Sequence, residues 1–309
     1  MTTGLLLVDK PQGLTSHDVV ARARRALNTR KVGHAGTLDP MATGLLTLGV
    51  GPATRLLTYL VGLDKTYETT MRLGAATTSD DAEGEVVSTA EPAAIAAVTD
   101  DALVAGIRAL TGEIDQRPSS VSAIKVDGKR AYDRVRAGEE VELASRRVTI
   151  SAFEALAVRR TATAIEVDAR IDCSSGTYIR ALARDLGTAL GIGGHLTALR
   201  RTRVGPFDVA DAVSLDELAE QGASLLASPA EVAAQLFPVL EVDAARARDL
   251  GHGKLLALPA QPDAEPVAAI ERGAGGAHPD RLVALISVRE GRGRTLVGFP
   301  NDSAQEAAP

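Results

Sequence analysis

Residues 33–44 read Gly33-His34-Ala35-Gly36-Thr37-Leu38-Asp39-Pro40-Met41-Ala42-Thr43-Gly44. Pro40 has a fixed φ and disfavours the helical conformation for Asp39, the residue before it. The three glycines allow backbone angles and close approaches that other residues do not. This stretch therefore predicts a rigid loop that presents one carboxylate to a bulky ligand. A turn or helix cap formed by Asp39 is the alternative, and local chemistry alone leaves both open.

The composition is that of a globular protein large enough for two domains. The chain has 309 residues, of which 45% are hydrophobic and 24% charged. No apolar run approaches the ~20 residues of a membrane helix, and the N-terminus lacks the pattern of a secretory signal. The single cysteine, Cys173, excludes an internal disulfide framework and a multi-cysteine zinc site. We therefore expect a cytoplasmic protein with no membrane association.

The charge is unevenly distributed along the chain. The net charge is −6, but residues 1–72 carry nine Lys and Arg against five Asp and Glu, whereas residues 207–309 carry eight against sixteen. A local positive field can steer a polyanion even when the whole chain is acidic. The composition therefore permits RNA binding without requiring it.

Periodicity and capping signals predict both strands and helices. Strands are expected at 5–9, 45–50, 67–73, 148–158, 164–172, 281–288 and 294–299. Helices are expected from an N-cap at Ser16 to about Leu27, from an N-cap at Thr99 to about Leu110, and at 178–190, 214–220 and 243–250. The Asp127-Gly128 pair is a hairpin signal. Residues 259–280 are expected to form a loop, and a domain boundary is expected near Leu236-Phe237-Pro238.

Five sequence blocks in order resemble the bacterial tRNA pseudouridine synthase B (TruB) family. The first contains Asp9-Lys10-Pro11 and Thr15-Ser16-His17, and the second is the Asp39 stretch. The others are Lys65-Thr66-Tyr67 with Arg72-Leu73-Gly74, Cys173-Ser-Ser-Gly176-Thr-Tyr178-Ile-Arg180, and Gly194-His195-Leu-Thr-Ala-Leu199-Arg200-Arg201. The resemblance covers roughly the first two-thirds of the chain, and five ordered blocks are far more specific than one Leu-Asp-Pro.

The resemblance implies an α+β fold with two domains. Residues 1–236 would form a pseudouridine-synthase catalytic core with a long mixed, largely antiparallel sheet flanked by helices. Residues 237–309 would form a small β-rich, PUA-like domain, although the acidic balance of this segment argues against a strong grip on RNA.

The resemblance also implies the reaction, which is isomerisation of the T-loop uridine at tRNA position 55 to pseudouridine. Asp39 would be the nucleophile and Arg180 the cation that stabilises its charged form. Because the product is an isomer of the substrate, neither a cofactor nor a metal ion is required. Sequence does not separate attack of the carboxylate on the base from a glycal-type route through the sugar.

Further residues acquire substrate roles from the same resemblance. Tyr67, Tyr178 and Leu199 would line the uracil pocket, and His34 would occupy the space left by the flipped base. Phosphate contacts are expected from Lys10, Arg30, Lys31, Arg200 and Arg201. Core packing is the alternative for the pocket residues, and an ordinary surface arginine is the alternative for Arg180.

The expected partner is the tRNA T stem-loop, bound by a monomer that needs no obligate protein partner. A non-catalytic tRNA-binding or tRNA-folding protein is the rival function from another class. A synthase acting on a different RNA is the third reading. The intact set of Asp39, Tyr67 and Arg180 argues against a loss of catalysis.

Overall fold

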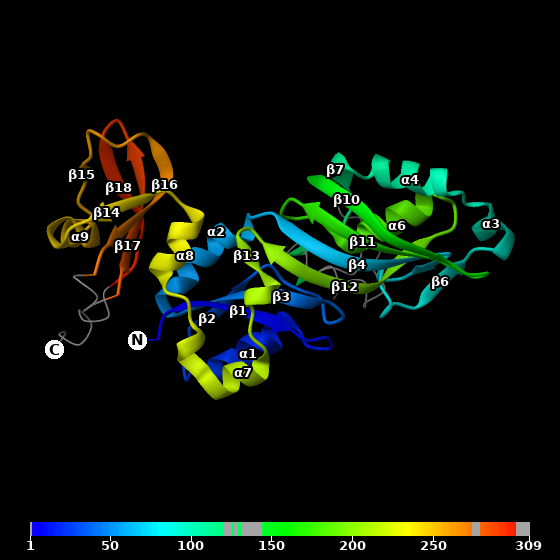
Figure 1. Ribbon diagram of the computed structural model, residues 1–309, viewed down its shortest axis with the longest axis horizontal. Helices are drawn as coiled ribbons and strands as arrows, with labels where there is room; N and C mark the ends of the chain where they lie inside the picture. Colours follow the sequence, from blue (N-terminus) through cyan, green and yellow to red (C-terminus); the bar gives the residue numbers. More distant parts are fainter. Residues whose placement is uncertain (1, 120–124, 127–128, 131–143, 274–278, 301–309) are drawn as a thin grey trace.

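The computed structural model describes residues 2–119, 125–126, 129–130, 144–273 and 279–300. These residues form one large sheet with helices around it and a separate smaller sheet near the C-terminus (Figure 1). The large sheet has nine strands, and its main path runs β1-β3-β12-β4-β11-β10-β7. Only the β12–β3 pair is parallel along this path, so the predicted mixed, largely antiparallel sheet is confirmed.

The strands of the large sheet are β1 (Gly4–Lys10), β2 (Val32–Ala35), β3 (Thr43–Val50), β4 (Lys65–Leu73), β7 (Gly112–Gln116), β10 (Arg146–Arg160), β11 (Ile165–Cys173), β12 (Gly194–Val204) and β13 (Phe207–Asp208). Two hairpins stand apart, β5 (Ala75–Thr77) with β6 (Val86–Thr89), and β8 (Lys125–Val126) with β9 (Lys129–Arg130). The smaller sheet contains β14 (Val239–Val242), β15 (Leu256–Ala257), β16 (Ala264–Glu271), β17 (Arg281–Arg289) and β18 (Arg292–Gly298).

The α-helices are α1 (Ser16–Ala26), α2 (Leu57–Val61), α3 (Pro92–Ala97), α4 (Asp100–Ala109), α6 (Ile179–Ala189), α7 (Leu215–Gln221), α8 (Pro229–Leu236) and α9 (Ala244–Gly251). Three short 3₁₀ helices occur at η1 (Gly51–Leu56), η2 (Val209–Asp211) and η3 (Gly222–Leu225). In the part of the chain that the structure describes, no helix combines the length and hydropathy needed to span a bilayer.

Strand β4 lies in the middle of the large sheet and reads Lys-Thr-Tyr-Glu-Thr-Thr-Met-Arg-Leu. Its alternate residues Tyr67, Met71 and Leu73 are buried, whereas Glu68 is exposed on the opposite face. This period of two is what a strand with one covered face requires. The alternation places Tyr67 on the covered face.

Helix α6 lies against β12, and a glycine permits the close approach. A Cβ atom on Gly187 would lie 2.2 Å from the carbonyl carbon of Gly193, which is too close for any side chain. The helix begins one residue later than expected, with Tyr178 as its N-cap. Arg180 is therefore in the first turn, where its side chain can reach the Asp39 loop.

The N-cap of α1 is Thr15, and not Ser16 as expected from the sequence. Thr15 accepts a hydrogen bond from the Asp18 amide, and the Asp18 side chain accepts one from the Thr15 amide. This capping box satisfies two amides at the helix start. Ser16 is instead buried and contacts the Asp39 loop.

Several other predictions from the sequence are corrected or completed by the structure. The prediction of a loop over residues 259–280 is wrong. This segment contains β16, which pairs with β14 on one side and with β17 on the other. Helix α8 occupies the Ala- and Ser-rich stretch after α7, where no element was assigned. The predicted helices capped by Thr99 and beginning near Asp243 are confirmed. Strands β8 and β9 form a hairpin, but its Asp127-Gly128 turn lies outside the described residues.

The two sheets share an apolar cluster, with α8 between them (Figure 1). This cluster combines Leu5 of β1 and Leu45 of β3 with Ile270 of β16 and Leu285 of β17. Val232 of α8 is fully buried in the same cluster. The smaller sheet therefore packs, through α8, on the N-terminal part of the large one.

Candidate active site

The Asp39 loop, residues 36–42, connects β2 to β3. Residues in and just before α1 form hydrogen bonds with it. The Leu38 amide donates to Ser16 Oγ at 2.9 Å, and Ser16 Oγ lies 3.1 Å from the Leu38 carbonyl oxygen. The Gly13 amide donates to the Pro40 carbonyl at 2.8 Å. Both neighbours of Asp39 are thus anchored, which restricts where its carboxylate can point.

Lys10 and Arg201 support the same loop from the interior. Lys10 Nζ donates to the carbonyls of Leu14 at 2.7 Å, Pro11 at 3.0 Å and Pro40 at 3.4 Å. Burial lowers the pKa of Lys10 to about 8. Arg201 donates to the Gly36 and Leu45 carbonyls, both within 2.9 Å.

The expected phosphate contacts of Lys10 and Arg201 are therefore corrected. Their exposed fractions are 0% and 1%, so neither side chain is at the surface where RNA would pass. Each donates to backbone carbonyls in or next to the Asp39 loop, and buried carbonyls need such donors. These two cations shape the site instead of binding phosphate.

Arg180 forms an ion pair with Asp39. Its Nε lies 3.1 Å from Asp39 Oδ2, and its Nη1 lies 3.2 Å from Asp81 Oδ2 and donates to the Ser79 carbonyl at 2.8 Å. The side chains of Arg180 and Asp81 are 7% and 4% exposed, whereas that of Asp39 is 40% exposed. Of the three charges, the carboxylate of Asp39 is the one that a ligand can reach.

A cavity of about 510 Å³ opens beside this ion pair. Such a volume is typical of sites for small organic groups, which span about 300–1,000 Å³. Its lining includes Asp39, Tyr67, Tyr178, Arg180 and Leu199, five of the six residues to which the sequence resemblance gives catalytic or base-binding roles. They come from a loop, β4, the start of α6 and β12. The fold thus brings together residues that are far apart in the sequence.

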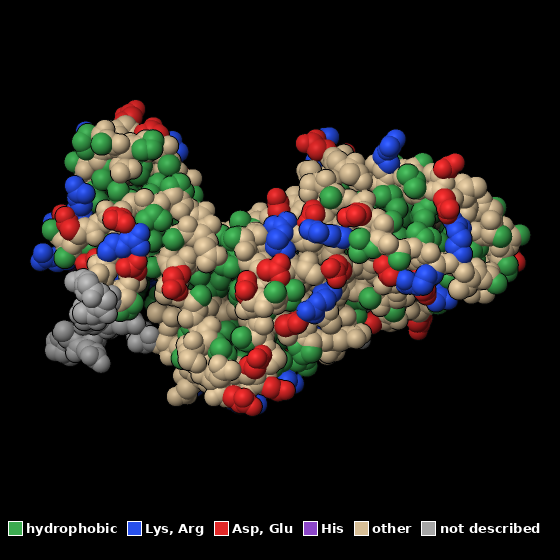
Figure 2. Space-filling view, in the orientation of Figure 1, with side chains coloured by type: hydrophobic (Ala, Val, Ile, Leu, Met, Phe, Trp, Pro, Cys, Tyr) green, Lys and Arg blue, Asp and Glu red, His purple; other side chains and the backbone are tan. Residues whose placement is uncertain are grey.

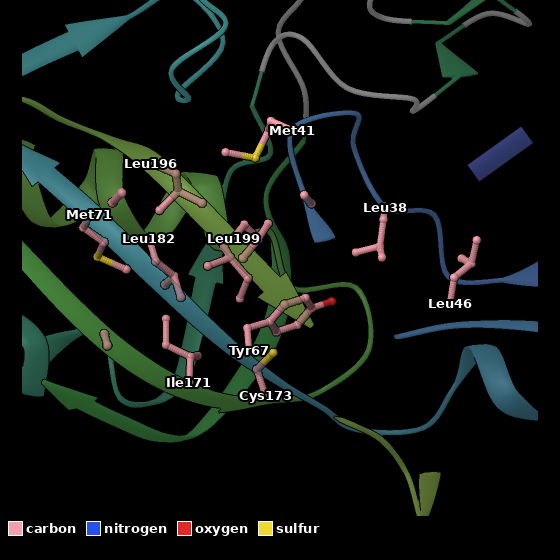
Figure 3. Close-up of a cluster of buried hydrophobic side chains, with 14 of the residues drawn as sticks. Leu38, Met41, Leu46, Tyr67, Met71, Ile171, Cys173, Leu182, Leu196 and Leu199 are labelled. Carbon is pink, nitrogen blue, oxygen red and sulfur yellow. The ribbon is translucent and has the colours of Figure 1, made fainter. Parts of the chain in front are cut away.

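Tyr67 is at the centre of the buried cluster below the cavity. Its ring lies between Leu199 and Cys173, and its hydroxyl points toward the side where Leu38 lies (Figure 3). Burial raises the pKa of Tyr67 and also that of Tyr178 above the usual value for a phenol. Both rings are therefore neutral at physiological pH, as stacking on a base requires.

His34, the sixth of these residues, lies on β2 and is not part of the cavity lining. Its ring packs edge-on against His17, with the two centroids 5.5 Å apart. Burial lowers the pKa of His34, with His17 and Arg201 adding to the effect. His34 Nδ1 is buried and has no hydrogen-bond partner among the described residues. The imidazole is thus neutral and half-buried at the rear of the Asp39 loop.

The remaining predicted RNA contacts lie at the surface. Arg30 and Lys31 are exposed in the segment between α1 and β2. Arg200 is half-buried and forms a two-pronged ion pair with Asp9, at 2.7 and 2.9 Å. Arg72, Arg159 and Arg203 are likewise paired with acidic residues of the sheet. Figure 2 shows the result, with Lys and Arg interspersed among Asp and Glu on this face.

Sequence reasoning missed Asp81, Lys65 and Gln116. Asp81 holds Arg180, Lys65 lines the cavity, and Gln116 is hydrogen-bonded to Tyr178. The run Ser79-Asp80-Asp81 gave little signal, because Thr77, Thr78, Glu83 and Glu85 around it make the stretch typical of an exposed polar turn. Nothing in the local sequence around Gln116 distinguishes it from a surface glutamine.

Comparison with known proteins identifies the family. Residues 24–179 match the family model "TruB family pseudouridylate synthase (N terminal domain)". Residues 180–240 match "tRNA pseudouridylate synthase B C-terminal domain", and residues 237–300 match "tRNA Pseudouridine synthase II, C terminal".

Curated relatives match along nearly the whole chain. A protein of Leifsonia xyli subsp. xyli named tRNA pseudouridine synthase B is 60% identical over 302 residues, which cover 97% of each chain. A protein of Arthrobacter sp. with the same name is 54% identical over 99% of each chain. Among solved structures, an H/ACA RNP bound to a substrate RNA containing 2′-deoxyuridine aligns with a TM-score of 0.70 at 25% identity, over 96% of this chain and 85% of that one. This chain therefore belongs to the TruB family of pseudouridylate synthases, which are isomerases.

Proposed function

We propose that this protein converts the T-loop uridine at tRNA position 55 into pseudouridine, with Asp39 as the nucleophile. The observation that carries the proposal is the Asp39–Arg180 ion pair at 3.1 Å, on the wall of a cavity that Tyr67, Tyr178 and Leu199 also line. The names of the relatives, tRNA pseudouridine synthase B, support tRNA as the substrate.

The reaction breaks the bond between ribose C1′ and N1 of uracil and forms one between C1′ and C5. C5 loses a proton and N1 gains one, so atoms balance without an external donor. Asp39 is suited to the nucleophilic step because its carboxylate faces a cation and is still exposed to the cavity. Both routes, through the base and through the sugar, use this one carboxylate.

The aromatic residues are suited to holding an extruded base. Stacking on an aromatic ring contributes about 1–3 kcal/mol per base, which is comparable with the few kcal/mol that extrusion of a nucleotide costs. Tyr67 lies where its ring could stack on the uracil, and its neutral hydroxyl could pass on the C5 proton by releasing its own as it accepts it. Leu199 and Tyr178 would close the pocket around it, and His34, on the strand that leads into the Asp39 loop, would occupy the space left by the flipped base.

The RNA would bind along the surface next to the cavity. Arg30 and Lys31 are exposed cations that precede β2, the strand that leads into the Asp39 loop, and we assign phosphate contacts to them and, with its Asp9 partner, to Arg200. Residues 1–236 would form the catalytic unit and residues 237–309 a PUA-like unit. We propose that the protein acts as a monomer on the T stem-loop in the cytoplasm.

The test is to incubate the purified protein with an unmodified tRNA transcript, without added metal or cofactor, and to map pseudouridine. We expect product at the T loop only. The Asp39→Asn variant keeps the size of the side chain but loses its charge, so it should bind tRNA within about tenfold of wild type, or 1.4 kcal/mol, and give no product. Product at another uridine would refute the assigned substrate, and turnover by Asp39→Asn would refute the nucleophile.

A further inference from the structure

The side chain of Gln116 is hydrogen-bonded to both polar groups of the Tyr178 backbone. Its Nε2 donates to the Tyr178 carbonyl oxygen at 3.0 Å, and its Oε1 accepts from the Tyr178 amide at 2.7 Å. Gln116 is the last residue of β7, 62 positions earlier in the chain, and is 1% exposed. The side-chain amide of Gln116 therefore pairs with the backbone of Tyr178 as a residue of a neighbouring strand would.

This pairing occurs at a helix start that has no side-chain cap. Tyr178 is the N-cap of α6, and its own side chain makes no capping hydrogen bond. Hydrogen bonds to both the N–H and the C=O of one residue restrict the two peptide groups that flank its Cα atom, which one bond does not. Gln116 thus sets the start of the helix that carries Arg180 toward Asp39.

The residues after Gln116 are fastened to the same helix by a second polar cluster. Arg184, in the second turn of α6, donates to the Arg117 carbonyl at 2.7 Å and to Asp80 Oδ2 at 3.1 Å. The Ser119 hydroxyl donates to the same Asp80 oxygen at 2.6 Å. The strand end that carries Gln116 is consequently rigid with respect to α6.

We propose that Gln116 is a positioning residue for the isomerisation. It acts through the Tyr178 backbone and sets two walls of the cavity at once, the Tyr178 ring and the Arg180 guanidinium beside Asp39. A displacement of about 1 Å at a reacting group can lower a rate on the order of 100-fold. This inference rests on the roles proposed above for Asp39 and Arg180.

Gln116→Glu provides the sharpest test because it keeps size and the oxygen that accepts from the Tyr178 amide. At neutral pH it replaces the donor with a second oxygen that faces the Tyr178 carbonyl. We expect the single-turnover rate at saturating tRNA to fall about 100-fold, with the Kd for tRNA changed less than about threefold, equal to 0.7 kcal/mol. Such a split between rate and affinity separates positioning from a general loss of structure.

The pH dependence adds an independent measurement. A buried carboxyl titrates above its usual range, and its protonated form again donates a hydrogen bond. The ratio of variant to wild-type rate should therefore rise as pH falls. Arg146, Arg180 and Asp39 act electrostatically on Tyr178 and are present in both proteins, so their effect is common to the two rates.

Glu113→Gln is the matched control, since Glu113 is on the same strand and its side chain is 68% exposed. The single-turnover rate of this variant should equal that of wild type at every pH. If Gln116→Glu does not fold, Gln116→Met decides by the same comparison of rate and affinity. A folded variant with the wild-type rate, or one that loses affinity as much as rate, would overturn the proposal. Asp39 is intact in these variants, so their outcome is distinct from that of Asp39→Asn.

Discussion

The guanidinium of Arg180 lies between Asp39 and Asp81, with Nε 3.1 Å from Asp39 Oδ2 and Nη1 3.2 Å from Asp81 Oδ2. Asp81 is the more deeply buried of the two carboxylates. It therefore fixes the orientation of the guanidinium, and the orientation directs Nε toward Asp39. The carboxylate that we propose as the nucleophile is thus positioned by a second, more deeply buried carboxylate.

Arg180→Lys should reduce the single-turnover rate at least about 100-fold, equal to about 2.7 kcal/mol of activation free energy. The planar guanidinium presents different nitrogens to Asp39 and to Asp81, and an ammonium group cannot reproduce this geometry. Quench-flow measurement at saturating tRNA checks the prediction. A near-normal rate would mean that Arg180 supplies only positive potential.

Asp81→Asn should lower the rate by about tenfold or more, equal to about 1.4 kcal/mol, with little change in tRNA affinity. The variant keeps volume but removes the charge that orients Arg180, and it leaves a buried cation with one partner fewer. Thermal unfolding should also shift to lower temperature. Glu85→Gln, at an exposed position of the same loop, serves as the control and should match wild type in rate and stability.

Arg30→Ala and Lys31→Ala should weaken tRNA binding and each reduce the slope of log affinity against log salt by about one. The effect is expected because a phosphate contact releases counterions. Arg201→Ala should instead destabilise the protein, since its guanidinium is buried against the Gly36 and Leu45 carbonyls. Fluorescence titrations of each surface variant with tRNA at several salt concentrations give this slope. An unchanged slope in both surface variants would mean that the RNA phosphates do not contact Arg30 or Lys31.

The stability contributed by Lys10 should increase with pH. Its pKa is lowered from 10.5 to about 8 in the folded protein, so between these values the unfolded chain binds more protons at this side chain. The free energy of unfolding then rises with pH over that window. Urea unfolding of wild type and Lys10→Met should show a difference that grows in favour of wild type from about pH 8 to about pH 10. A difference independent of pH would show that Lys10 titrates normally in the fold.

Local signals predicted most elements because they reflect local backbone preferences. Alternating apolar residues marked β4, and Thr99 and Asp243 marked the starts of α4 and α9. Strand β16 was missed because its core is short and begins with the turn-forming Ala264-Glu265-Pro266. It becomes a strand because β14 and β17 supply hydrogen-bond partners on both sides.

The sequence by itself pointed to the carboxylate that we propose as the nucleophile, to the loop that carries it, and to five of the residues that line the cavity. Pro40 and the neighbouring glycines restrict that loop whatever surrounds it. The tertiary structure alone decided which charges face each other. Asp81 and Arg180 are 99 positions apart, Gln116 and Tyr178 are 62 apart, and no periodicity relates them. Burial likewise decided the roles of Lys10 and Arg201, because a cation meets phosphate at the surface but satisfies backbone carbonyls when enclosed.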